Sequence, residues 1–379
     1  MRYIFISDVH IGTNTPENWY QSSAHETYLK AILQYIQTNS NEIQDVVILG
    51  DWLELWMYTP EPQISASLNE IINSNPGIFT KQADGDFITC MDSIQGNLCY
   101  VRGNHDMTIN FDELNNYIKL QSNTNKQIVC LDRIYGNNGI YAEHGHYYDL
   151  LCQPDNNDSN IYKPLPIGYF ISRVAALWCG QKLQKDNKQN SAELLNQGYP
   201  DKESIVKTII STIKDDYGSF AHILMINLSN LVGYKNPKEL IFTMPDGTSI
   251  SAAEIENLFP SVIKSIDDVI ELLLVNINNS LDDYGRALCN ESYNKIKNKV
   301  VVMGHTHSPV LKEHSFLGFD KAIYVNSGFL CPSIPDMGNG KIMTFVEVEE
   351  NQSGFIVRLK KVDYPDTTIT TLIESSSDK

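Results

Sequence analysis

Paired cysteines are missing from the sequence: its seven cysteines are scattered, with no C-x-x-C spacing. The common zinc-ribbon and thiol-redox motifs need cysteines in close pairs and are therefore excluded. The first apolar stretch is interrupted at Asp8, too early for a secretion signal. An odd, unclustered set of cysteines without such a signal predicts free thiols in a reducing, cytoplasmic location.

Long apolar runs are absent as well. No stretch approaches the roughly 18 consecutive apolar residues that a membrane-spanning helix needs, so no membrane span is predicted. Hydrophobic residues nevertheless make up 42% of the 379 residues, which is enough for a substantial core. The composition predicts a soluble globular protein with one large domain or two ordinary ones.

Positively charged residues are few relative to negatively charged ones. Lysine and arginine number 29 against 46 aspartate and glutamate residues, which gives a formal net charge of -17 at pH 7. An acidic surface repels phosphate backbones, so nucleic acid is an unfavourable partner and nuclease activity is a disfavoured alternative. A small-molecule substrate fits this composition better, and no feature of it indicates an oligomeric state.

Five short apolar runs each end in a cluster of polar residues. The runs are rich in Val, Ile and Tyr and lack alternation, which is typical of buried strands. They cover residues 3–6, 46–49, 98–101, 140–142 and 300–303, and the clusters that follow are 7–10, 50–51, 102–106, 143–146 and 304–307. A helical pattern over 24–37 makes the first part β-α-β. Sites in such α/β sheets form beyond the carboxyl ends of the strands, where every cluster lies.

Residues 150–298 have a different pattern. Apolar residues recur there at three- and four-residue spacing, which predicts helices over 167–183, 205–213, 221–231 and 263–275. Ser251 and Glu254 fit a capping box at the start of a further helix. The strand pattern resumes at Val300. We therefore predict that residues 150–298, called the insertion below, form a mostly helical segment within a catalytic domain made of residues 1–149 and 299–366.

The C-terminal part is expected to continue as strands. A strand is predicted over 322–326 and a hairpin over 342–362. Residues 367–379 contain three consecutive serines and follow the last predicted strand. They are predicted to be a frayed tail.

The polar clusters contain a set of metal-ligand side chains without a thiolate. Asp8 and His10 are two residues apart at a strand end, so their side chains can converge. Asp51 follows a glycine, and its carboxylate can bridge two cations, which a histidine cannot do. The remaining candidate ligands are Asn104, His144, His305 and His307. Such oxygen and nitrogen donors suit two divalent cations, with Mn²⁺ as first choice and Fe, Zn or Ni as alternatives to it, rather than Ca²⁺.

Two cations held about 3.5–4 Å apart suit phosphoryl transfer. They can activate a bridging water for in-line attack, and the reaction otherwise needs mainly positioning and neutralisation of charge. His105 follows a candidate ligand, and Asp106 follows His105. We predict that this pair is catalytic, with His105 protonating the leaving oxygen or stabilising the charge that develops.

Five motifs together resemble those of the calcineurin-like metallophosphoesterases. In chain order they are Asp8-Val9-His10, Gly50-Asp51, Gly103-Asn104-His105-Asp106, His144 and Gly304-His305-Thr306-His307. The resemblance covers about residues 1–146 and 300–362. It implies a four-layer α/β/β/α sandwich and a dinuclear metal centre.

The resemblance also implies a role for each matching residue. One metal would be bound by Asp8, His10 and His307. The other would be bound by Asn104, His144 and His305. Asp51 would bridge the two metals, and His105 would be the proton donor. The activity implied is hydrolysis of a phosphomonoester, phosphodiester or pyrophosphate bond.

Within this family, some segments are similar to the UDP-2,3-diacylglucosamine diphosphatases. These are residues 7–12, residues 50–56 and His144-Gly145. The chain has His105 where those enzymes typically carry Arg, and His146 where they carry Asp. Its insertion is also much longer than theirs. A pyrophosphatase of that type is therefore one alternative function, and a metal-bound scaffold with vestigial catalysis is another.

Two further residues are candidates for substrate binding. His146 lies two residues after His144 and either faces the site or orients His144. Arg173 lies near the start of the first insertion helix, where a guanidinium could bind a phosphate through two hydrogen bonds; a surface ion pair is its alternative. Glu54 is assigned to a supporting position behind the ligands or to a helix surface.

Overall fold

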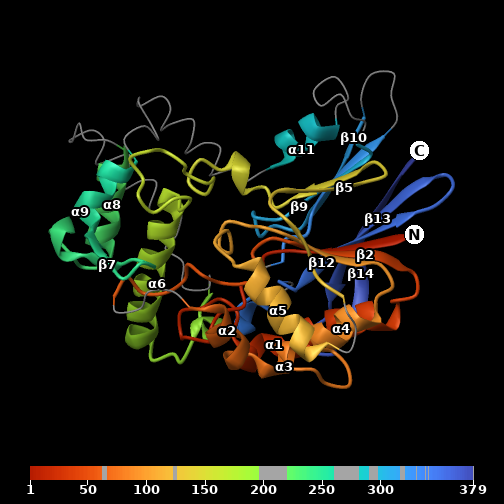
Figure 1. Ribbon diagram of the computed structural model, residues 1–379, viewed down its shortest axis with the longest axis horizontal. Coiled ribbons are helices and arrows are strands. Elements are labelled where there is room, and N and C mark those ends of the chain that lie inside the picture. Colours follow the sequence, from red (N-terminus) through yellow and green to blue (C-terminus); the bar gives the residue numbers. More distant parts are fainter. Residues whose placement is uncertain are drawn as a thin grey trace.

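The computed structural model describes residues 1–61, 66–122, 126–195, 220–259, 281–289, 298–315, 321–329, 331–337, 339 and 341–378. Within them, two β-sheets lie face to face, with helices on the outer face of each (Figure 1). The predicted helices over 205–213 and 263–275 lie outside the described residues. Among the described helices, none is both long and apolar enough to cross a membrane.

The first sheet has seven strands in the order β14-β13-β12-β1-β2-β3-β4. Its central strands β1 to β4 are parallel to one another, and β12 to β14 are added antiparallel at one edge. The bounds are β1 (Arg2–Ile6), β2 (Ile43–Leu49), β3 (Asn97–Val101), β4 (Val129–Leu131), β12 (Thr344–Glu350), β13 (Gly354–Val362) and β14 (Ile369–Asp378).

The second sheet has five strands in the order β10-β11-β9-β6-β5. Strands β6, β9 and β11 are parallel, so their carboxyl ends also meet at one edge. The bounds are β5 (Ile134–Asn137), β6 (Ile140–Glu143), β9 (Val300–Met303), β10 (Val310–His314) and β11 (Ala322–Asn326).

Successive side chains of each strand point to opposite faces of the sheet, and this divides the core into layers. In β1, Tyr3 and Phe5 point between the sheets, where they meet Val302 and Val325 of the second sheet. Ile4 and Ile6 of the same strand point the other way, toward the helices. Since both faces of the central strands are covered, the strands are apolar throughout, as the sequence pattern indicated.

Helices on the outer face of the first sheet precede or follow its parallel strands. The longest is α1 (Ser22–Thr38), whose buried Leu29, Ile32, Leu33 and Ile36 face the sheet. The others are α2 (Leu68–Ser74), α3 (Pro76–Phe79), α4 (Phe87–Ser93) and α5 (Phe111–Gln121). The helix α2 begins with a capping box made by Ser67 and Glu70. A short helix, α13 (Ile334–Met337), follows β11.

The outer face of the second sheet is covered by α11 (Asp282–Cys289). Its Leu288 and Cys289, together with the preceding Leu281, pack against Val301 and Met303 of β9. This helix completes the predicted four-layer α/β/β/α sandwich. Residues 282–289 were predicted to belong to the insertion, but α11 packs on β9 as part of the sandwich.

The C-terminal segment is ordered as a strand. The predicted hairpin is present as β12 and β13, and β14 then pairs along the full length of β13, from Val362↔Ile369 to Gly354↔Asp378. The prediction of a frayed tail over 367–379 is therefore wrong for residues 369–378. Alternating burial of Ser375 and Ser377 shows that small polar residues can occupy the covered face of an edge strand.

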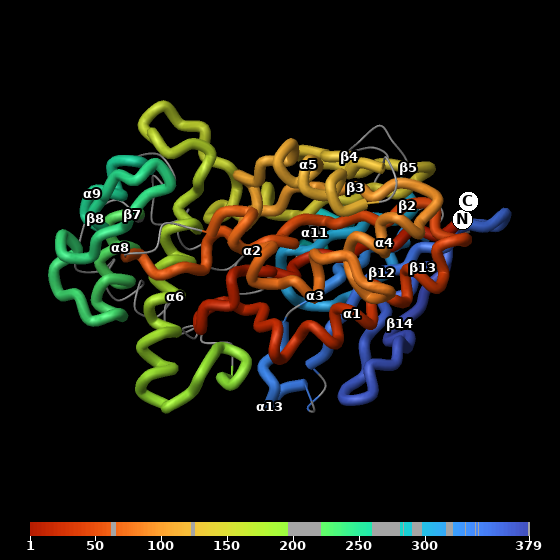
Figure 2. The backbone as a smooth tube through the Cα atoms, turned by 60° about the horizontal axis from the view of Figure 1, so that its bottom comes forward, coloured from red at the N-terminus to blue at the C-terminus, as the bar shows by residue number. Residues whose placement is uncertain are grey.

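The described part of the insertion is mostly helical and lies to one side of the sandwich, away from the adjacent chain termini (Figure 2). Two predicted helices are present as α6 (Ile167–Asp186) and α8 (Phe220–Leu231). The capping box at Ser251 begins the one-turn helix α9 (Ala252–Ile255). The remaining elements are η1 (His146–Tyr148), which precedes the insertion, η2 (Ser191–Glu193), η4 (Pro237–Glu239), β7 (Ile241–Thr243), β8 (Ser249–Ser251) and η5 (Glu256–Leu258).

His25 of α1 is fully buried as a neutral ring. Its Nδ1 accepts a hydrogen bond from the backbone N–H of Gln21 at 2.8 Å, and its Nε2 donates to the carbonyl of Pro332 at 3.0 Å. Burial lowers the pKa of His25 to about 4. A proton on this ring therefore favours the unfolded chain.

The fold is expected to lose stability in mild acid through His25. The unfolded chain takes up the proton near pH 6.5 and the folded chain only near pH 4, so stability falls across that range, by about 3 kcal/mol in total. Urea titrations at about pH 7 and about pH 4.5 measure the effect, and its size should shrink by about 2 kcal/mol in His25→Gln. An identical pH dependence in the two proteins would contradict this assignment.

Candidate metal centre

Five of the predicted ligands have unusual backbone geometry. Asp8, His10, Asp51, His305 and His307 all have positive φ, between 52° and 69°. This left-handed region is uncommon for residues with a side chain and costs about 1–3 kcal/mol each. Such strain persists only where the surrounding structure enforces it, and here it is concentrated at the strand ends that carry the polar clusters.

Glycines allow these loops to approach one another. Gly50 has a φ of 82° and turns the chain between β2 and Asp51. A Cβ atom at Gly103 would collide with the Asp51 carboxylate, and one at Gly304 would collide with that of Asp8. The glycine of each motif is therefore needed for the close packing of the ligands.

The first group of ligands comes from the ends of β1 and β9. Asp8, His10 and His307 present ligand atoms within 4.8 Å of one another, close enough to hold one cation. The Nε2 atom of His307 lies 3.8 Å from Asp8 Oδ1. The same Asp8 oxygen accepts a 2.8 Å hydrogen bond from the backbone N–H of His305, which fixes the carboxylate.

The second group comes from the ends of β2, β3, β6 and β9. Ligand atoms within 4.8 Å of one another are again presented, here by Asp51, His144 and His305. The Nε2 atom of His144 lies 3.1 Å from Asp51 Oδ2 and 3.1 Å from Asn104 Oδ1. His305 Nδ1 lies 3.0 Å from the same amide oxygen. The structure thus brings all seven predicted metal ligands together at the joined carboxyl ends of both sheets.

Asp51 lies between the two groups. Its Oδ2 atom is 3.1 Å from His144 Nε2 in the second group and 3.8 Å from His10 Nε2 in the first. Its Oδ1 atom accepts a 2.7 Å hydrogen bond from the backbone N–H of His105. This is the position that a bridging carboxylate needs.

Acceptors behind three of the histidines fix their tautomers. Glu54 Oε2 lies 2.9 Å from His10 Nδ1, the Leu49 carbonyl lies 2.8 Å from His144 Nδ1, and Asp149 Oδ2 lies 3.0 Å from His305 Nε2. Each ring donates a proton to that acceptor, and its other nitrogen faces the site, where it could bind a cation once it carries a lone pair. Acceptors of this kind orient histidine ligands in metalloproteins.

Orphaned nitrogens show that this site fits a metal. His10 is 1% exposed, and its Nε2 has no hydrogen-bond partner among the described residues. A buried ring nitrogen left unpaired is unfavourable unless something absent from the protein chain uses its lone pair. The donor set of carboxylate, amide and imidazole groups suits a divalent transition metal.

The charges of the site also suit a cation. Burial opposes ionisation of Asp51, but His144 and His105 outweigh it and hold the pKa of Asp51 well below its usual range. Burial likewise opposes a charge on His144, yet Asp51 raises the pKa of His144 to about 10. Without a metal, a proton therefore balances the carboxylate. A cation must displace that proton, so cation binding here weakens as pH falls.

His105 faces the site but belongs to neither ligand group. Its Nδ1 atom donates to Glu54 Oε1 at 2.8 Å, which leaves Nε2 for a substrate. Burial disfavours the charged ring, but Glu54 and Asp51 reverse this effect and raise the pKa of His105. Burial opposes ionisation of Glu54, and His105 and His10 in turn lower its pKa to about 2. The His105 ring is thus equipped to carry a proton.

Sequence reasoning gave Glu54 a supporting place and missed Asp149. Glu54 contacts both His10 and His105, and its Oε1 also accepts from the backbone N–H of Trp56 and Met57 at 2.7 and 2.8 Å. A carboxylate three residues after Asp51 was the available signal for Glu54. Asp149 had a weaker signal, since it lies only five residues after His144 and faces His305 from a turn after η1.

Asp106 accepts hydrogen bonds from the loops around it, and its direct part in catalysis stays a prediction. Its side chain is fully buried, and its Oδ2 accepts from the backbone N–H of Trp52 at 3.0 Å and from the hydroxyl of Tyr100 at 2.5 Å. Its Oδ1 accepts from the backbone N–H of Gly103 at 2.7 Å. Asp106 therefore holds the Asp51 and Asn104 loops together as a positioning residue.

Arg173 does not lie on the surface, so the surface ion pair is excluded, and its contact with substrate stays a prediction. The side chain is fully buried. Its guanidinium donates to the hydroxyl of Tyr169 and to the carbonyls of Thr59, Pro60 and Thr243, at 2.6 to 3.1 Å. Its role is to attach α6 to the segment after the Asp51 motif and to β7.

His146 lies next to the ligands, and its contact with substrate stays a prediction. Its ring is 5.3 Å from that of His144 and 4.5 Å from that of Tyr147. The residue is 1% exposed, and its Nδ1 has no hydrogen-bond partner in the described part of the chain. Burial lowers the pKa of His146 well below its usual range, so the ring is neutral.

A four-layer sandwich with this ligand set defines a metal-binding protein of the metallophosphoesterase type. The sequence model of the calcineurin-like phosphoesterases matches residues 1–200. The chain belongs to the calcineurin-like phosphoesterase family. No curated protein matches the sequence.

Solved structures give a distant likeness. Vps29 from Entamoeba histolytica, both as a single mutant and as a wild-type complex with Zn²⁺, is 10% identical with a TM-score of 0.31, and 99% of each chain is covered. GAP50, described as the anchor in the inner membrane complex of Plasmodium, is also 10% identical, with a TM-score of 0.34 over 100% of this chain and 88% of that one. Scores this low carry no argument about function.

Proposed function

We propose that this protein is a hydrolase that uses two divalent cations to cleave a phosphoester or phosphoanhydride bond of a small molecule. The observation that carries the proposal is the position of Asp51 between two groups of ligands, with His105 beside them and outside both. A site built only to hold metal has no use for a buried histidine paired with a carboxylate and turned toward the same space.

The protein's own groups divide the work of such a reaction. When bound, the cations supply positive charge to the phosphoryl oxygens and lower the pKa of water. Asp8, His10 and His307 would hold one cation, and Asn104, His144 and His305 the other, with Asp51 shared. His105 Nε2 would donate a proton to the leaving oxygen, and Glu54 would stabilise the charged ring before transfer.

The substrate class extends the proposal. The net charge of -17 favours a small phosphoester over nucleic acid, because a long phosphate backbone would be repelled. A pyrophosphatase that resembles the UDP-2,3-diacylglucosamine diphosphatases is the alternative substrate class. All seven cysteines lie in the described residues and none forms a disulfide there, which supports a cytoplasmic location.

A substrate screen across several metals tests the proposal. The purified protein is stripped with a chelator, reloaded separately with Mn²⁺, Fe²⁺, Zn²⁺ or Ni²⁺, and assayed with aryl monoesters, bis-aryl diesters and a nucleotide pyrophosphate. Turnover should vanish on chelation and return with Mn²⁺. Bound metal without turnover of any of these compounds would overturn the proposal and favour a metal-bound scaffold.

A further inference from the structure

Among the described residues, one hydrogen bond holds the ring of His105. Its Nδ1 donates to Glu54 at 2.8 Å. A bond at one nitrogen fixes that nitrogen but lets the ring tilt about the bond, so the position of Nε2 depends on what packs against the ring faces. Misplacement of a reacting group by about 1 Å can lower a rate about 10²-fold.

In the described part of the chain, three aromatic rings surround that of His105. Trp56 lies nearly parallel to it, at 30° with ring centroids 4.6 Å apart. His10 meets it edge-on at 4.6 Å, and Trp19 is tilted at 5.3 Å. Of the three, the Trp56 indole covers a face of the His105 ring and limits its tilt. Trp56 is 1% exposed, so the indole is shielded from bulk solvent.

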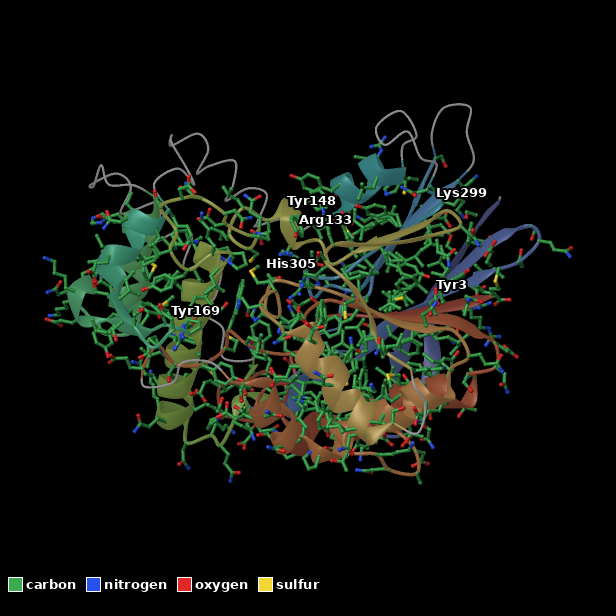
Figure 3. The ribbon with its side chains drawn as sticks, in the orientation of Figure 1. Tyr3, Arg133, Tyr148, Tyr169, Lys299 and His305 are labelled. Carbon is green, nitrogen blue, oxygen red and sulfur yellow. The ribbon has the colours of Figure 1, made fainter. Side chains whose placement is uncertain are left out.

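The side chain of Trp56 belongs to the core of the insertion. It packs with Leu165 and Ile167 and with Tyr169 of α6, and not with the core under the first sheet. The Tyr169 ring meets the Trp56 ring edge-on, at 87° and 6.0 Å. Figure 3 shows Tyr169 on α6 and His305 between α6 and the sheets.

Arg173 fixes Tyr169 relative to the chain segment that carries Trp56. Its Nη1 donates to the Tyr169 hydroxyl at 2.6 Å, and its Nη2 donates to the Thr59 carbonyl at 2.7 Å. Thr59 lies three residues after Trp56. Helix α6, Tyr169 and the Trp56 segment are therefore held as one unit in a buried region, where such hydrogen bonds are strong.

We infer that the insertion positions His105 for proton transfer, through Tyr169 and Trp56. Trp56 is a positioning residue: it sets the plane of the His105 ring and so directs Nε2 toward the leaving oxygen. The insertion is thus part of the catalytic apparatus in addition to any surface it presents to substrate. This inference rests on the proposed function, because it concerns the proton donor of the same site.

The dependence of rate on the leaving group tests the inference. A phenyl ester needs a proton on its leaving oxygen, whereas a dinitrophenyl ester leaves readily without one. Trp56→Leu should lower kcat for the phenyl ester at least about tenfold more than for the dinitrophenyl ester. Tyr169→Leu should lower the ratio of kcat for the phenyl ester to kcat for the dinitrophenyl ester in the same way. Trp56→Phe, which keeps an aromatic ring, should leave this ratio close to the wild-type value. His105→Ala sets the upper limit of the shift.

Phe242→Leu is the matched control. Phe242 of β7 is fully buried in the same core, and the ring that it meets is that of Phe170, at 5.4 Å. This variant damages the insertion core comparably and should leave the ratio of the two rates unchanged. Equal loss on both esters in Trp56→Leu and Tyr169→Leu would overturn the inference. Absence of wild-type turnover with either ester is a distinct result that would overturn the proposed function and the inference with it.

Discussion

Asp51→Asn is expected to lower kcat/KM for an aryl phosphoester by about 10³-fold or more, with loss of bound metal. The amide keeps the shape of the side chain, and its oxygen can still face one ligand group. It cannot face both, because the second position becomes an NH₂ group that points at a cation or at a histidine. The measurements are steady-state kinetics and metal content per chain, with the urea midpoint as a check of folding.

Asp84→Asn is the matched control for this change. Asp84 is exposed, and its carboxylate accepts a hydrogen bond from Gln34 at 3.1 Å, so the same chemical change occurs far from the strand ends. Activity and metal content should stay within about twofold of wild type. Robust turnover by Asp51→Asn would refute a mechanism in which this carboxylate is shared by two cations.

His105→Ala is expected to lower kcat by about 10²- to 10³-fold while metal content stays close to that of the wild type. His105 lies outside both ligand groups, so its removal should leave the two cations in place. Loss of its proton should slow the departure of poor leaving groups most. Metal content and kcat, determined on the same preparation, separate these effects.

His222→Ala serves as the control for this variant. His222 lies on α8 and pairs with Glu256 at 2.6 Å, far in the chain from the strand-end clusters. Its loss should change kcat by less than about twofold.

His10, Glu54 and His105 also lie close enough together to hold a cation. A parallel loss of metal and activity in His105→Ala would assign His105 to metal binding and reject it as proton donor.

The strands and their polar clusters could be predicted because both signals are local. A run such as Val300 to Met303 is buried on both faces wherever it lies in a sheet, and its composition reports this directly. Parallel strands also impose a polarity, so residues that follow them share one edge of the sheet. Those two facts are enough to place Asp8 and Asp51 at one edge of the first sheet from residue order and type alone, whereas His305 follows a strand of the second sheet.

Side-chain directions could not be predicted in the same way. Asp106 and Glu54 are both carboxylates near the motifs, yet Asp106 turns into the loop backbone and Glu54 turns toward two histidines. The burial of Arg173 could not be predicted either, because an arginine is usually exposed. It is buried here because backbone carbonyls accept hydrogen bonds from its guanidinium. Most of these contacts join residues far apart in the chain, beyond the reach of any local pattern.

The predicted boundaries of helices and strands were wrong where the elements that they pack against decided them. Residues 369–378 are polar and serine-rich, and they form β14 because β13 offers an unpaired edge. Helix α11 resembles the other helices of the insertion in sequence, but it covers the second sheet because that face would otherwise expose Val301 and Met303.

The sequence by itself determined the class of the fold, the candidate ligands and the family, because spacing and residue type encode strands, turns and metal donors locally. Only the tertiary structure decided which oxygen of Asp51 faces which histidine, which acceptors fix the tautomers, and that Trp56 joins the insertion to His105. Those features depend on distances across the fold, which arise when two sheets and the insertion are packed around one edge.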